Sequence, residues 1–118
     1  MLVWDETEIL ACLEAEPQIE PDGVSYQYTV RKDGMRMELL VHPLDGDVYL
    51  DLYRDGVEQP VFAMNILECP GIRTVRGASG EHLEIAATGA IHGRYDRESA
   101  IPSGVCVWAN PTLRIELY

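Results

Sequence analysis

The chain has 118 residues, of which 47% are hydrophobic and 25% charged, and its formal net charge is −11. This length suits one domain with its own core, and the composition excludes extensive disorder. The negative charge argues against nucleic acid and anionic membranes as partners, because both carry charge of the same sign. A basic protein partner remains compatible with it.

Cysteine usage and the N-terminus indicate the cellular setting. The cysteines Cys12, Cys69 and Cys106 are widely spaced and form no Cys-x-x-Cys pair, so reduced thiols are expected. The first residues lack the basic and apolar regions of a signal peptide, and no apolar run is long enough to cross a membrane. We therefore expect a soluble, cytoplasmic protein.

The first element predicted is a helix over residues 5–16. Asp5 and Glu8 have the spacing of a capping box, and the acidic first turn suits the positive end of the helix dipole. Apolar residues between positions 9 and 13 supply one buried face. Pro17 is expected to end the helix, because proline disfavours helical geometry in the preceding residue.

Residues 24–32 and 35–42 then give the strongest local pattern. Apolar and polar side chains alternate in both, and the Asp-Gly pair at 33–34 favours a two-residue type I′ turn. Such a turn would pair Tyr28 with Leu39, so that apolar residues face one another throughout. A shift of one residue would send the two apolar faces to opposite sides.

Further alternating segments predict the rest of the fold. Short strands are expected at about 48–54, 57–66, 72–76, 81–88, 105–109 and 112–118. Tight turns between strands favour antiparallel neighbours. The predicted fold is therefore a single α+β domain over residues 1–118, with the N-terminal helix packed on a curved, mainly antiparallel β-meander of about seven to eight short strands.

Motifs for enzymatic chemistry are absent from the sequence. The Gly-Ala-Ser-Gly run at 77–80 fits a hairpin turn and lacks the setting of a nucleophile elbow. His42, His82 and His92 lack the spacing of a zinc site, which would have to be assembled from distant strands, with Cys69 or Cys106. We therefore expect no catalytic residue, no metal and no cofactor.

The irregular segment 89–104 is the first candidate for function, because long loops in compact domains are often functional. Its charged and hydrogen-bonding side chains would suit an anionic or polar ligand. The candidate ligand-binding residues are His82, His92, Arg94, Tyr95, Asp96 and Arg97. The competing interpretation is a solvated loop held by local ion pairs.

The acidic N-terminal part is the second candidate. Seven acidic residues precede the first basic one, Arg31. Such a bias suits docking to a basic partner, and outward tyrosines would suit an interface. The candidate partner-binding residues are Glu6, Glu14, Glu16, Tyr49 and Tyr53. A solvated helix face is the competing interpretation.

The leading functional hypothesis is a small acidic, non-enzymatic binding module for a protein partner, in the manner of an immunity-type inhibitor or a secretion chaperone. The alternative is a small-ligand-binding or enzymatic pocket between the sheet and the 89–104 loop. A third hypothesis is a homo-oligomer formed by pairing of an edge strand such as the C-terminal one.

Overall fold

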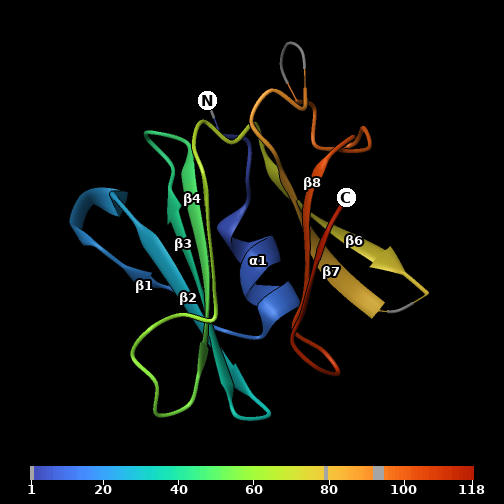
Figure 1. Cartoon of the computed structure of the whole chain (residues 1–118). Helices are drawn as coiled ribbons and strands as arrows, with labels where there is room; N and C mark the ends of the chain where they lie inside the picture. Colours follow the sequence, from blue (N-terminus) through green and yellow to red (C-terminus); the bar gives the residue numbers. More distant parts are fainter. Residues whose placement is uncertain (1, 79, 92–94) are drawn as a thin grey trace.

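The computed structural model describes residues 2–78, 80–91 and 95–118, which form one α-helix, one short 3₁₀ helix and nine strands (Figure 1). In chain order they are α1 Glu6–Leu13, β1 Gln18–Ile19, η1 Pro21–Gly23, β2 Tyr26–Lys32, β3 Met35–His42, β4 Asp47–Arg54, β5 Phe62–Ile66, β6 Ile72–Gly77, β7 Gly80–Ala86, β8 Gly104–Trp108 and β9 Arg114–Leu117.

The strands make two antiparallel sheets, and the helix lies between them. The first sheet has the order β1-β2-β3-β4-β5 and the second the order β6-β7-β8-β9. Figure 1 shows α1 between the two sheets. The predicted α+β class with a helix packed on antiparallel strands is confirmed. The single meander is divided in two at residues 67–71, where Glu68 has a positive φ and Pro70 lacks an N–H.

The predicted hairpin and its pairing are confirmed. Tyr28 pairs with Leu39, and the ladder continues to Lys32 opposite Met35. The two turn residues at 33–34 both have positive φ, of 53° and 75°, as a type I′ turn requires. The alternating pattern therefore placed the paired residues of this hairpin on the correct faces. It was wrong for Val24, which is exposed, and Ser25, which is buried, because β2 begins only at Tyr26.

The helix begins as predicted but ends earlier. The Asp5 carboxylate caps it by accepting hydrogen bonds from the backbone of Thr7 at 2.8 Å and of Glu8 at 3.3 Å. The helix stops at Leu13 because Glu14 turns into the left-handed conformation, with φ 54° and ψ 42°. The expected end at Pro17 was therefore wrong. Residues 14–16, which were expected to be helical, instead lead into the edge strand β1. This strand was not predicted, and it pairs with β2.

The return strand of the second hairpin is also shorter than expected. The alternation predicted a strand over 57–66, whereas β5 starts at Phe62. Pro60 precedes it and cannot donate to a ladder, so the segment before β5 forms the connection from β4.

The core is a sandwich of apolar side chains from three layers. The helix contributes Ile9, Cys12 and Leu13, each at most 4% exposed. The first sheet contributes Tyr28, Val30, Met37, Leu39, Val41, Val48 and Leu50, and the second contributes Ile72, Leu83, Ile85, Val105 and Val107. Each sheet therefore has one apolar face toward α1 and one outer face. Within the described ranges, the helices are too short or too polar to cross a membrane.

Candidate functional site

The outer face of the first sheet, which points away from α1, carries a continuous row of side chains. Strand pairing aligns one residue from each strand in the order Gln18, Gln27, Leu40, Tyr49 and Asn65. Neighbouring strands lie about 4.8 Å apart, so this row spans roughly 19 Å. It connects the edge strand β1 with the tyrosines of β4, which makes them parts of one surface.

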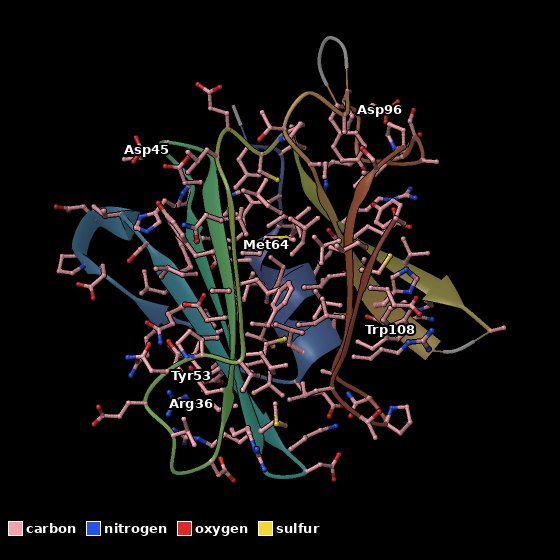
Figure 2. The ribbon with its side chains drawn as sticks, viewed as in Figure 1. Arg36, Asp45, Tyr53, Met64, Asp96 and Trp108 are labelled. Atoms are coloured by element: carbon pink, nitrogen blue, oxygen red, sulfur yellow. The ribbon has the colours of Figure 1, made fainter. Side chains whose placement is uncertain are left out.

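The two tyrosines predicted for partner binding lie on this face, and both are half-buried. Tyr49 meets the ring of His42 edge-on, with centroids 5.5 Å apart. The guanidinium of Arg36 lies over the ring of Tyr53 at 4.3 Å, and Figure 2 shows these two side chains beside each other. Arg36 Nε is also 2.9 Å from Glu38 Oε2, although the two are not aligned as a hydrogen bond. These contacts pack each aromatic ring against a neighbouring side chain on the outer face.

The acidic segment, residues 14–22, runs from the end of α1 through the edge strand β1 of this sheet. Its four carboxylates are Glu14, Glu16, Glu20 and Asp22, and all four residues are exposed. None of them forms an ion pair with a basic side chain among the described residues. Its middle part is β1, which borders the row of outer-face side chains, whereas Glu14 at its start lies at a hollow beside the second sheet.

Glu6, the remaining partner-binding candidate, lies elsewhere. It is exposed on α1, and its backbone carbonyl accepts a hydrogen bond from the buried Tyr28 hydroxyl at 3.1 Å. Because α1 packs on the inner side of the first sheet, Glu6 does not share a surface with Tyr49 and Tyr53. Glu14 also lies elsewhere, because it ends α1 and lines a hollow with Gly80 and Glu81 of the second sheet.

The described ligand-binding candidates Asp96 and Arg97 are used in contacts within the protein. Asp96 accepts hydrogen bonds from the backbone of Glu98 and Ser99, and these bonds, led by those from Ser99, lower the pKa of its carboxyl. The Arg97 guanidinium pairs with Glu8 and lies 3.8 Å from Asp5, which ties the loop to the start of α1. Candidates His92 and Arg94 lie outside the described residues.

Tyr95 borders a cleft at one end of the molecule. It is buried, and its ring packs so closely on Gly71 that a Cβ there would approach it to 2.4 Å. Burial raises the pKa of its hydroxyl, which has no hydrogen-bond partner among the described residues. The neighbouring cleft has a volume of about 1010 Å³. It is lined by residues of the β3–β4 turn, the 67–71 connection and the 89–104 loop.

His82 belongs to a different group of side chains, on the outer face of the second sheet. Its ring stacks on Trp108, with centroids 4.5 Å apart, and Figure 2 labels Trp108 on this sheet. Glu84 follows two residues later on β7 and faces Cys106 across the ladder to β8. The spacing of His82 and Glu84 could have been recognised in the sequence as one face of a strand. The sequence left Cys69 and Cys106 open as possible partners of a histidine, and the choice of Cys106 depends on strand pairing.

Comparison with known proteins shows that this chain resembles a solved structure in its fold. No protein-family model matches the sequence, and no curated protein matches it. Among solved structures, a chain of the "Contact-dependent growth inhibition toxin - immunity protein complex from Klebsiella pneumoniae 342" is similar, with a TM-score of 0.74 and 15% sequence identity. The match covers 97% of this chain and 92% of that chain. At this identity it shows that the two share a fold.

Proposed function

We propose that this protein is a non-enzymatic binding module that docks a basic protein through the acidic segment and the adjoining outer face of the first sheet. In its specific form, the proposal is an immunity-type inhibitor that neutralises a basic toxin domain. The observation that carries it is that the four exposed carboxylates of residues 14–22 have no ion-pair partner among the described residues, in a segment whose strand β1 joins the sheet that carries Tyr49 and Tyr53.

The position of Glu14 adds support because it is unfavourable for the fold. A non-glycine residue in the left-handed conformation is strained by about 1–2 kcal/mol. A carboxylate at the C-terminus of a helix also opposes the helix dipole, and the last turn of α1 has no basic residue. The left-handed turn itself closes the helix, since the Glu14 backbone N–H donates to the Leu10 carbonyl. The unfavourable choice is therefore the carboxylate side chain at this position, and side chains that break a local rule are expected at functional positions.

The surface also has the chemistry of a protein interface. Exposed acidic groups at a rim accelerate association with a basic partner, and tyrosines are enriched at interface centres. The likeness in fold to a chain of a toxin–immunity protein complex is compatible with this function. This likeness is the reason for proposing an immunity-type inhibitor and not another kind of acidic binding module.

The first experiment compares protein capture from the native cells at low salt by the wild type and by E14K/E16K. We expect the wild type to retain one predominant basic protein, which salt elutes, and the charge-reversed variant to lose it. A matched control is E58K/E98K, which makes the same change of net charge at two exposed positions on other connections. Equal loss in both variants would point to net charge alone and would refute a defined docking surface.

A second experiment tests the immunity form. The captured partner is expressed in a host cell with or without this protein, and growth is measured. Growth arrest by the partner alone, relieved by the wild type and less by E14K/E16K, is the expected outcome. A partner that binds at the acidic segment without any effect on growth would support the binding module and refute the immunity function.

A second candidate function is ligand binding in the cleft beside Tyr95. The observation that favours it is the buried Tyr95 hydroxyl without a hydrogen-bond partner among the described residues, next to a volume of about 1010 Å³. A small-molecule screen by thermal shift on the wild type and on Tyr95→Phe would test it. A ligand of this cleft should raise the melting temperature of the wild type more than that of the variant. Equal shifts would refute a role for the hydroxyl.

A further inference from the structure

We propose that His82, Glu84 and Cys106, on the outer face of the second sheet, form a binding site for a zinc ion. The site is independent of the proposed protein-binding surface on the first sheet. The inference rests on the mutual approach of three different ligand types and on a histidine whose nitrogens are not used by the fold.

The three side chains converge because of the strand pattern. His82 and Glu84 are two residues apart on β7 and therefore point to the same face, while Cys106 stands opposite Glu84 on β8. One ligand atom from each residue lies within 4.8 Å of the other two. In tetrahedral zinc sites, bond lengths of about 2.0–2.3 Å place ligand atoms roughly 3.3–3.8 Å apart. Small side-chain rotations would close the remaining distance.

The imidazole of His82 is available as a ligand. Its Nδ1 is buried without a hydrogen-bond partner among the described residues. Its Nε2 lies 3.8 Å from Glu84 Oε1, which is too far for a hydrogen bond. Nε2, which faces Glu84, is therefore the nitrogen that would bind zinc, and Nδ1 would donate its hydrogen to a water molecule. Stacking against Trp108 fixes the ring, so that little side-chain freedom would be lost on binding.

Glu84 is oriented by Arg73 in a way that leaves one oxygen free. Both Nε and Nη2 of Arg73 contact Oε2, at 3.0 Å and 2.9 Å. The other oxygen, Oε1, faces His82. Hydrogen bonds of this kind, from a neighbouring group to a ligating carboxylate, are typical of metal sites. The side chains of Glu84 and His82 are only 14% and 12% exposed.

Nitrogen, oxygen and sulfur donors together favour zinc over calcium or magnesium, which prefer oxygen alone. Glu116 stands opposite Cys106 on β9 and is paired with Arg114, which lies over the Trp108 ring. A water molecule or Glu116 would complete the four-coordinate site. The Glu84 carboxylate and the Cys106 thiolate would balance the charge of the zinc ion. Arg73 and Arg114 are also positive and would weaken its binding.

Zinc must displace the thiol proton to bind. Burial, with the neighbouring charges of Glu84 and Glu116, raises the pKa of Cys106 to about 11. Binding therefore converts one Cys106 S–H and Zn²⁺ into a Zn–S bond and a released proton.

The first test uses cobalt(II) as a spectroscopic substitute for zinc, with the whole chain. The expected result is one equivalent of bound cobalt, a thiolate-to-cobalt charge-transfer band, and its loss on addition of zinc. Cys106→Ala should abolish the band, and His82→Ala should weaken zinc binding by more than about 100-fold, since even outer contacts to ligands contribute 10- to 100-fold. His42→Ala, a histidine on the first sheet, serves as the matched control and should bind as the wild type does.

The second test needs no variant and therefore does not depend on mutant folding. Wild-type protein is alkylated with and without zinc, and the modified cysteines are identified by mass spectrometry. Zinc should slow modification of Cys106, while Cys12 and Cys69, at 4% and 2% exposure, stay protected in both samples. An unchanged rate at Cys106, or cobalt bound without a thiolate band, would overturn the proposal.

Discussion

The Tyr28 hydroxyl donates a hydrogen bond to the backbone carbonyl of Glu6 at 3.1 Å, which joins the inner face of the first sheet to the first turn of α1. A corresponding contact on the other side connects the Thr74 hydroxyl with the carbonyl of Glu8 at 3.4 Å. Both sheets are therefore fixed to the same turn of the helix. This arrangement determines how the helix is positioned between them.

Tyr28→Phe should destabilise the protein by about 1 kcal/mol. The substitution keeps the ring in the core but removes the hydroxyl, and a typical buried hydrogen bond contributes that amount. Urea denaturation followed by circular dichroism measures the difference. Tyr49→Phe on the outer face is the control and should change stability by less than about 0.5 kcal/mol. Equal stability of Tyr28→Phe and the wild type would contradict a contribution from this bond.

Glu14→Gly should stabilise the protein by about 1 kcal/mol. Glycine adopts the left-handed conformation found here, φ 54° and ψ 42°, without the strain of a side chain. The thermal midpoint should rise accordingly. Glu16→Gly removes a carboxylate nearby without relieving a left-handed residue and should not raise it. A gain of equal size in both variants would show that charge, and not backbone strain, is responsible.

Gly104→Ala should destabilise by about 1–3 kcal/mol or more. A Cβ at this position would lie 2.0 Å from the backbone oxygen of Ile85 and 3.1 Å from the Cα of Ala86, so β7 and β8 would be forced apart. Gly77→Ala is the matched control, since the nearest atom to its added Cβ is 4.0 Å away. Chemical denaturation of the two variants gives the comparison. A stable Gly104→Ala protein would mean that the strands can separate at low cost.

The turn at residues 96–99 should weaken in acid. Hydrogen bonds from Ser99 and Glu98 lower the pKa of Asp96 from its ordinary value of 3.8. Because the pKa of Asp96 is lower in the folded state, its ionised carboxylate stabilises the folded turn at pH values above the unfolded pKa. This stabilisation is lost as the pH falls through the folded-state pKa. The Asp96 carboxyl and Ser99 amide signals in an NMR titration should report a midpoint below that of the urea-unfolded chain. A midpoint at or above the unfolded value would contradict this.

The sequence predicted those parts of the fold in which a local rule determines the structure. The hairpin at 26–42 was correct in its pairing because alternation and the Asp-Gly turn require the same alignment. The end of α1 was wrong because the left-handed turn at Glu14 is not encoded by a glycine. The division into two sheets was missed because alternation identifies strands but does not determine which of them are neighbours.

The candidate sites illustrate the same limit. Tyr49 and Tyr53 were recognised as one outward face because their spacing alone indicates it. The acidic segment was recognised by composition, but its junction with that face depends on β1, a two-residue strand too short to predict. Cys106 joins His82 and Glu84 through the pairing of β7 with β8, two strands separated by a long connection in the sequence.

The position of α1 between the sheets has a consequence for hydrogen exchange. No strand ladder joins the two sheets in the described parts of the chain, and α1 contributes apolar surface to both. An opening that releases the helix would expose the inner faces of both sheets at once. The slowest-exchanging amides of β3 and β7 should therefore share one opening free energy. The eight residues of α1 would then make two separate ladders behave as a single cooperative unit.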